Sequence, residues 1–422
     1  MTIPAAAIPL RPWQLGLMFF IALSPSLGTA VAALGRLVLM LWALFVLLIP
    51  HKANGKSEAW SLHKPITVSI LLACFYMALS TLWSSADTER TWFSWINHAR
   101  LLTIPLVFYL LRDPAQARQV LRVFIGTQIF VGFSSWLLIA GYTPPWISGT
   151  DSQTTFASYG SYLEESIVQA TCAGLLWFQR DWIFGPKGRW FAIAIAMSCS
   201  TLTFKFLPGR SGHMVLLALI ALIVFQALPK RIRWLALLAP FLVGVLLWFS
   251  TPNFKIRLMA VYTDSVDFGR QANAATSAGL RLQYWKSSLQ SYAESPVLGH
   301  GAGSWNSEFL NQLVKHPNPT VEPNHGSRDP HQLFLLWAVE GGTVGLLCLI
   351  FTLIYVVKNS RYLPQQDAWS LYALLLSLVV ASMFNSTIYG IGNGDFFCVG
   401  IGILLSLAAA KRQTQSAASL PP

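Results

Sequence analysis

The sequence predicts an all-α polytopic membrane protein, and two observations support this prediction. Of its 422 residues, 54% are hydrophobic and only 11% are charged. The apolar residues are gathered in runs of roughly twenty, the length of an α-helix that crosses the hydrocarbon core of a bilayer. Because these runs recur along the chain with short polar segments between them, we expect about 12 transmembrane helices.

The predicted spans follow one another from Arg11 onward, as expected for a membrane anchor and not for a cleaved signal peptide. Only a tight turn with Pro25 and Gly28 separates the first two spans. The predicted spans cover residues 13–26, 29–50, 66–83, 93–111, 119–141, 161–178, 190–207, 213–229, 234–250, 331–357, 367–387 and 395–410.

The basic residues indicate the orientation of these spans. A net charge of +12 would suit a nucleic-acid partner only if the basic residues clustered on one soluble face, and here they are spread between hydrophobic runs. The short loops on one side are consistently rich in Lys and Arg. The positive-inside rule therefore places those loops and both termini in the cytoplasm. We expect a membrane protein with no nucleic-acid partner.

One long polar loop divides the chain. Residues 1–250 hold the first nine predicted helices, residues 251–330 form the loop on the non-cytoplasmic side, residues 331–412 hold helices ten to twelve, and residues 413–422 form a cytoplasmic tail. Loops of this length are uncommon unless they have a structure or function of their own.

The loop is expected to form a small helical lid on the membrane face. Apolar residues at helical spacing predict two amphipathic helices, the first with Leu282, Trp285, Leu289 and Tyr292, the second with Trp305, Phe309 and Leu313. Ser277 is the expected cap of the first helix, and Pro296 and Pro317 are the expected stops. The Pro-rich connector, residues 316–330, is expected to be extended.

His331 is the candidate general base. It lies where the loop enters span ten, directly after Pro330, a residue suited to the first turn of a helix. An imidazole has an ordinary pKa of about 6.5, so at neutral pH it can take a proton from a hydroxyl group. The alternative is an interfacial histidine that only caps the helix or forms a hydrogen bond.

Two arginines are candidate anion receptors. Arg210 occupies a tight turn between spans seven and eight, where Ser211 offers a cap for span eight. A cation beside a helix N-terminus suits a phosphate or diphosphate. Arg281 projects from the first lid helix and could turn toward the same place. The alternatives are a snorkelling arginine for Arg210 and a solvated charge for Arg281.

Other charges fall inside predicted spans, where they are costly and therefore candidates for function. Arg36 in span two and Lys205 near the end of span seven lie toward the non-cytoplasmic side, which makes them candidate diphosphate-binding residues. Arg100 in span four could pair with Glu340 in span ten as a buried structural ion pair.

Neither a metal site nor a cofactor is expected. His300, His316, His325 and His331 share the loop with acidic residues, but their intervals match no standard ligand spacing. Residues 299–305 contain G-x-G without the preceding strand and G-K-S/T ending of a phosphate loop. The five cysteines lie in apolar runs, so we expect no disulfide framework.

Two stretches resemble the bacterial O-antigen ligase and polymerase superfamily. "RLQYWKSSLQSYAESPVLGHGAGSW" followed by "DPHQLFLLWAVEGGTVGLL" is similar to its lid and following span, and the arginine of "PGRSGH" resembles its other marker. His331-Gln332, nine residues, then Gly342 and Gly345 fit the ligase pattern of a histidine, a small polar residue, nine positions and a spaced glycine pair. Met214 stands where that pattern has leucine. The likeness is sharp over residues 277–347 and only topological elsewhere.

The resemblance implies a metal-independent inverting glycosyltransferase of the bacterial inner membrane, with its active site facing the periplasm. Such an enzyme moves O-antigen from undecaprenyl diphosphate to the lipid A-core oligosaccharide in lipopolysaccharide biosynthesis. By the same resemblance, His331 would be the general base, and Arg210 with Arg281 would neutralise the departing lipid diphosphate. The glycines after His331 are expected to let a neighbouring helix pack closely.

Other functions remain open. An O-antigen polymerase would use the same donor with another glycan as acceptor, and a third relative would glycosylate pilin. A flippase for the same lipid predicts inverted repeats and charges along a pathway through the bilayer. Here the strongest candidates gather at one face beneath an asymmetric lid, which favours an enzyme. No ATP is available in the periplasm, so the donor itself must supply the energy for transfer.

Overall fold

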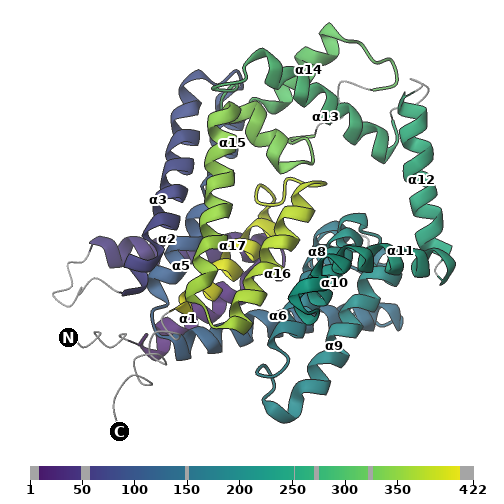
Figure 1. The fold of residues 1–422 in the computed structure, drawn as a ribbon. Helices are drawn as coiled ribbons and strands as arrows, with labels where there is room; N and C mark the ends of the chain where they lie inside the picture. The colour runs from purple at the N-terminus through teal and green to yellow at the C-terminus, as the bar shows by residue number, and fades with distance from the viewer. Residues whose placement is uncertain are drawn as a thin grey trace.

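A computed structural model describes residues 9–48, 58–147, 152–250, 252–269, 275–321 and 327–408. All regular secondary structure in these ranges is helical, which confirms the predicted all-α class. Figure 1 shows long helices packed beside one another, with α13 (Ser277–Glu294) and α14 (Trp305–Lys315) across one end, next to the start of α15 (Leu333–Asn359). These two helices are the predicted lid.

Every predicted span overlaps helical structure. Before the loop the helices are α1 (Pro12–Leu23), α2 (Thr29–Leu48), α3 (Glu58–Leu79), α4 (Thr88–His98), α5 (Thr103–Leu110), α6 (Pro114–Ile139), α7 (Ser152–Thr155), α8 (Tyr162–Gln179), α9 (Arg189–Thr201), α10 (Arg210–Ala227) and α11 (Ala239–Ser250). The loop begins with α12 (Pro252–Gly269), which was not predicted, and α15 is followed by α16 (Gln365–Ser382) and α17 (Ile391–Ser406).

Six described segments are long and apolar enough to cross a membrane, so the count of 12 spans remains a prediction. They are Thr29–Val46, His63–Trp83, Pro114–Ile139, Arg210–Ala227, Lys230–Phe249 and Leu333–Tyr362.

The predicted span 93–111 is not one continuous α-helix. It consists of α4, a 3₁₀ turn at Ala99–Leu102 and α5. Pro105 has no N–H to donate to the carbonyl of Leu101, so the α-helical ladder is interrupted there. The break places Arg100 in the 3₁₀ turn, between the two helical pieces.

A compact apolar cluster joins the lid to α15. Tyr284 of α13, Trp305 and Phe309 of α14, and Leu336 and Val339 of α15 are buried together. The predicted apolar face of α14 is therefore confirmed. Because these aromatic side chains bury large apolar areas, the cluster fixes the lid above the residues that begin α15.

The predicted apolar face of α13 is wrong. The N-cap is Thr276 instead of Ser277, and its side chain accepts the Gly279 N–H. The side chain of Leu289 is 56% exposed. The buried positions of α13 are Gly279, Gln283, Tyr284, Ser287, Ser288 and Ser291. Small serine side chains let α14 approach closely, and this close contact decides which face of α13 is buried.

Gly342 breaks α15 and admits the chain that leaves α13. Its φ is +61°, and an added Cβ would lie 2.2 Å from the carbonyl oxygen of Val297. The Thr343 N–H donates to the carbonyl of Pro296 (2.8 Å). In the other direction, the N–H groups of residues 300 and 301 donate to α15 carbonyls at 2.8 and 2.9 Å. The break thus ties the lid to α15 by backbone hydrogen bonds.

The neighbouring glycines have the predicted role. An added Cβ at Gly341 or Gly345 would lie 3.3 Å from the ring of Tyr76 in α3. The Tyr76 hydroxyl donates to the Gly341 carbonyl at 2.9 Å. Small residues therefore let α3 pack closely behind the start of α15, as predicted.

Candidate active site

His331 lies two residues before α15 in a backbone conformation that few L-residues adopt. Its φ is +51°. Holding a residue other than glycine in this left-handed region costs on the order of 1 kcal/mol. The N-cap of α15 is Gln332, so Pro330 precedes the helix and does not occupy its first turn as predicted. The imidazole faces the lid, with its centroid 6.1 Å from that of the Tyr284 ring.

Asp329 holds His331 in this conformation. Asp329 Oδ1 accepts the His331 N–H (2.7 Å) and the Ser386 hydroxyl (2.5 Å). The same oxygen lies 3.6 Å from His331 Nδ1. The Ser327 hydroxyl donates to the Asp329 carbonyl oxygen at 2.7 Å. Asp329 is one of the acidic residues that share the loop with the four histidines, and it has no predicted role of its own. Its position two residues before the histidine is the available signal, because Asp side chains commonly accept backbone N–H groups two residues on.

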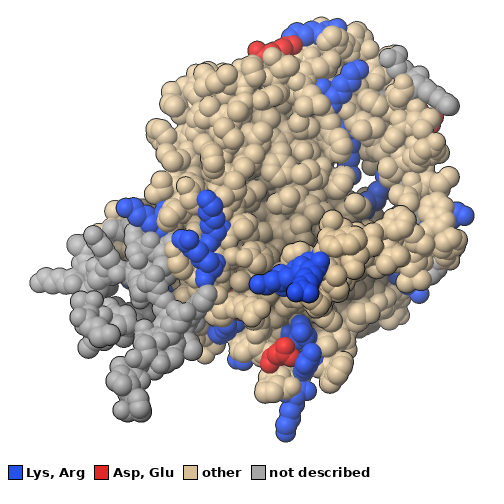
Figure 2. Space-filling model, viewed as in Figure 1, with Lys and Arg blue, Asp and Glu red and all other residues tan. Residues whose placement is uncertain are grey.

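Arg281 lies close enough to Arg210 and to His331 to interact electrostatically with both. Burial and the positive charge of Arg210 lower the pKa of Arg281. Burial also lowers the pKa of His331; the carboxylate of Asp329 acts in the opposite direction, and Arg281 lowers this pKa further. Figure 2 shows Lys and Arg side chains around a hollow below the lid. The structure therefore brings together the three strongest candidates from the sequence.

The turn before α10 places Arg210 beside free backbone N–H groups. Arg210 is the first residue of the helix, whose N-cap is Gly209. An added Cβ at Gly209 would lie 1.9 Å from the Ser166 hydroxyl oxygen, so only glycine lets this turn press against α8. Ser211 is not the cap that was predicted. Its hydroxyl instead accepts the side-chain amide of Asn385 (2.8 Å).

Residues 383–390, the loop between α16 and α17, contact both halves of this site. Asn385 donates to Ser211, beside Arg210, while Ser386 donates to Asp329, beside His331. Arg100, in the turn between α4 and α5, also contacts this loop. Its Nη1 donates to the carbonyl groups of Ile388, Tyr389 (2.7 Å) and Gly390 (2.8 Å). The 383–390 loop therefore links the cationic side of the site to the histidine.

The predicted pair of Arg100 and Glu340 is wrong. Arg100 Nε lies 3.1 Å from Asp395 Oδ1. Glu340 Oε2 instead lies 2.7 Å from His98 Nε2 and accepts the Ser94 hydroxyl at 2.7 Å. Ser94 and His98 are four residues apart and share one helix face, which faces α15. Arg100, two residues further in the 3₁₀ turn, is directed toward α17 instead.

Arg36 and Lys205 are not brought into the group around His331. Arg36 Nη1 lies 3.1 Å from Asp395 Oδ1, so Arg36 and Arg100 share one carboxylate inside the bundle. Lys205 is exposed, with Nζ 5.3 Å from the centroid of the Phe206 ring. Their assignment to substrate binding remains a prediction, and the geometry favours the two arginines near His331.

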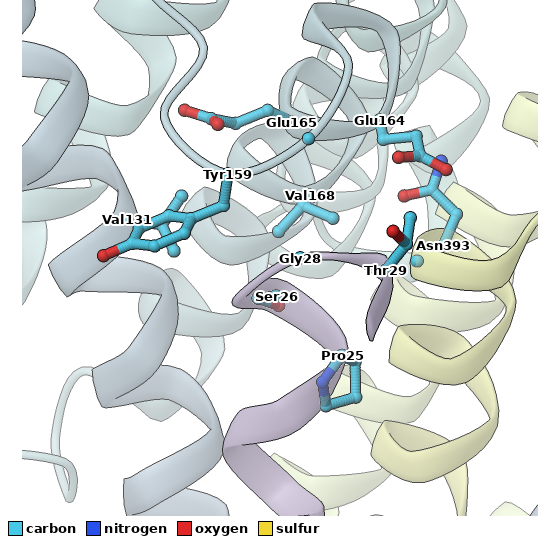
Figure 3. A pocket seen from close by; sticks show the side chains of 12 residues that line it. Pro25, Ser26, Gly28, Thr29, Val131, Tyr159, Glu164, Glu165, Val168 and Asn393 are labelled. Carbon is cyan, nitrogen blue, oxygen red and sulfur yellow. The ribbon is translucent and has the colours of Figure 1, made fainter. Parts of the chain in front are cut away.

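Two cavities near this end of the molecule differ in what they can hold. The first, about 40 Å³, lies between the α1–α2 turn and the starts of α8 and α17, with Glu164 and Asn393 close together on one side (Figure 3). It has room for only a few water molecules. The second is a cleft of about 540 Å³ lined by residues in and next to α4 and α14, by Ser327 and Arg328 of the connector, and by Tyr389 of the 383–390 loop. That volume suits a small-molecule ligand.

In the part of the chain that the structure describes, no three His, Cys, Asp or Glu side chains are placed to hold a metal ion. His300 Nε2 lies 2.8 Å from the Ser291 carbonyl oxygen, and its Nδ1 lies 3.5 Å from Glu308. His325 and Glu322 lie outside the described residues. The five cysteines are free thiols.

The fold and the site define a helical membrane protein in which an arginine of the lid, Arg281, lies near Arg210 and His331. Residues 192–350 match the family model for O-antigen ligase, a range that includes Arg210, Arg281 and His331. This match confirms the resemblance seen in the sequence: over these residues the chain is similar to O-antigen ligase. None of the curated proteins compared matches the chain.

Proposed function

We propose that the protein is a metal-independent inverting glycosyltransferase of the inner membrane that transfers O-antigen from undecaprenyl diphosphate to the lipid A-core oligosaccharide. One observation carries this proposal most strongly. An imidazole and two guanidinium groups from distant parts of the chain lie near one another at the lid, within the range that matches O-antigen ligase. The basic short loops on the opposite side orient this end toward the periplasm.

The reaction follows from the arrangement of these groups. His331 takes the proton of an acceptor hydroxyl while the hydroxyl oxygen attacks the anomeric carbon of the donor sugar. The bond from that carbon to the diphosphate oxygen breaks, and the lipid diphosphate leaves with the bonding electrons. Asp329 lies nearer Nδ1, which assigns Nε2 to the acceptor. Arg210 and Arg281 neutralise the charge that develops on the leaving group.

The electrostatics of the site suit both roles. Burial and Arg281 lower the pKa of His331, which keeps its imidazole neutral and able to accept a proton at neutral pH. Burial and Arg210 lower the pKa of Arg281, but an arginine stays protonated under physiological conditions. Two neighbouring cations that repel each other gain stabilisation when a dianionic diphosphate binds between them.

Transfer by the purified protein tests this proposal directly. With lipid-linked O-antigen, a lipid A-core acceptor and a chelator present, the wild-type protein should form product, whereas His331→Ala and Arg210→Ala should form almost none. Lys286→Ala is the matched control, because it removes an exposed cation from α13, the helix that carries Arg281, and it should retain most activity.

The outcomes separate the competing functions. Product elongated on a glycan instead of the core would identify a polymerase. Movement of donor lipid across vesicles without transfer would identify a flippase. Near wild-type transfer by His331→Ala would remove its role as base.

A further inference from the structure

The cleft between α4, α14 and the connector has the chemistry of a saccharide-binding site. Two aromatic rings, Phe93 and Tyr389, lie in its lining with centroids 6.0 Å apart at 78°. The carboxylates of Asp87 and Glu89 and the amide of Asn306 also line it. Carboxylates and amides bind hydroxyl groups, and aromatic faces pack against the C–H faces of sugar rings. Arg90 and Arg328 complete this mixed lining, in which acidic and basic side chains stand together.

The charges of the cleft also favour hydroxyl groups over a diphosphate. Asp87 accepts the Arg90 N–H (2.9 Å) and lies 3.2 Å from Arg90 Nε, so this arginine already has an anionic partner. Arg90 also donates to Asn306. Arg328 lies over the Phe93 ring, with Cζ 5.0 Å from its centroid. Carboxylates and guanidinium groups side by side provide both acceptors and donors for sugar hydroxyls.

The cleft adjoins the segment that carries the base. Ser327 lines the cleft, accepts the Asn306 amide at its carbonyl oxygen (2.9 Å) and donates its hydroxyl to Asp329 (2.7 Å). Burial raises the pKa of Tyr389, and the carboxylates of Glu340 and Asp329 raise it further. Asp329 is therefore close to Tyr389 of the cleft lining and also to Arg281.

The cleft is held in shape by tight packing between α4 and the start of α14. Gly303 has φ +84°, and an added Cβ would lie 2.6 Å from the Arg90 carbonyl oxygen. The Ser84 hydroxyl donates to the Ala302 carbonyl (2.7 Å), and the Ser85 hydroxyl donates to the Glu308 side chain at 2.7 Å. A site whose walls are fixed in this way loses little conformational entropy on binding.

We propose that this cleft binds the acceptor saccharide, so that its attacking hydroxyl reaches His331 from the side opposite the donor diphosphate. The inference rests on the proposed function. It assigns acceptor recognition to α4, α14 and the connector, and donor recognition to α10 and α13. Opposite approach of acceptor and leaving group is the geometry that an inverting displacement requires.

The test compares Michaelis constants for the two substrates in detergent-solubilised full-length protein. Phe93→Ala and Glu89→Gln should each raise KM for the acceptor about tenfold, equivalent to about 1.4 kcal/mol, and leave KM for the donor lipid within about twofold. Trp92→Ala is the matched control, because it removes an exposed aromatic side chain from the same helix outside the cleft lining. Trp92→Ala should leave both constants unchanged.

Binding of a water-soluble core oligosaccharide freed of its lipid provides a second readout that does not require turnover. Saturation-transfer NMR should detect contact with the wild-type protein and with His331→Ala, and should lose it with Phe93→Ala. Unchanged acceptor KM and unchanged binding in both cleft variants would overturn the inference while transfer itself persists. A rise in donor KM instead would show that the cleft holds the donor glycan. Absence of any transfer by the wild-type protein would count against the proposed function itself.

Discussion

Replacing Asp329 by Asn isolates the charge next to the proposed base. The amide keeps an oxygen that can accept the His331 N–H and the Ser386 hydroxyl, so the turn is preserved, but the negative charge 3.6 Å from Nδ1 is removed. When His331 accepts a proton during transfer, that charge stabilises the imidazolium.

The expected effect follows from Coulomb's law. Unit charges at this separation interact with about 4 to 5 kcal/mol at an effective dielectric constant of about 20, and with about 1 kcal/mol in water. The His331 side chain is 40% exposed, so solvent screens much of the interaction. We therefore expect a loss of about 1 to 2 kcal/mol of transition-state stabilisation, which is transfer about five- to thirtyfold slower.

The pH dependence gives a second, signed test. Burial lowers the pKa of His331, Asp329 raises it and Arg281 lowers it. Removing the carboxylate lowers this pKa further, so the neutral base persists to lower pH. The acid limb of the pH–rate profile should therefore move to lower pH in Asp329→Asn and to higher pH in Arg281→Gln.

The assay measures the rate of transfer at saturating donor from pH 4.5 to 8.5 for the wild-type protein and for each variant. Ser386→Ala, which removes a hydrogen bond and keeps the carboxylate, serves as the control for positioning. If Asp329→Asn slows transfer without moving the acid limb, or moves it to higher pH, the carboxylate only shapes the turn and the reasoning is refuted.

Two further predictions concern the framework of the site. Gly342→Ala should strongly lower the melting temperature in detergent, because Gly342 has a positive φ and an added Cβ would lie 2.2 Å from a backbone carbonyl oxygen. Gly345→Ala is the control and should lower the melting temperature little, because the nearest atom to its added Cβ is a side-chain atom at 3.3 Å. Equal decreases in melting temperature would contradict this prediction. Arg100→Met should cost about 1 to 3 kcal/mol, because buried carbonyl groups of the 383–390 loop lose their donor while Asp395 keeps Arg36 as its partner. It should also slow transfer, because the loop loses these hydrogen bonds. Wild-type thermal stability and activity of Arg100→Met would contradict this second prediction.

The candidate site could be predicted from the sequence to the extent that its residues carry local signals. Arg210 stands in a glycine-flanked turn, Arg281 on an amphipathic helix, and His331 at the start of a long apolar run. Each signal depends on neighbours within a few residues. These local patterns, together with the motif resemblance, were sufficient to predict that the three residues lie at one end of the protein.

The contacts that the sequence did not reveal join residues far apart in the chain. The pairing of Arg100 with Asp395 depends on a 3₁₀ turn that redirects the side chain, and apolar periodicity does not report such a turn. The buried face of α13 consists mostly of small polar residues, so the spacing of its apolar residues predicts the wrong buried face. The positive φ of His331 depends on an aspartate held by a serine 57 residues later.

The 383–390 loop has a consequence for engineering this protein. It lies beyond residues 192–350, the range that matches the family model, yet it holds Ser211 and Asp329 at the same time. A chimera that exchanges only the matched range between two such proteins would combine the reactive groups of one parent with the 383–390 loop of the other parent. Exchanges of specificity should therefore carry α16, α17 and the loop between them as part of the transplanted unit.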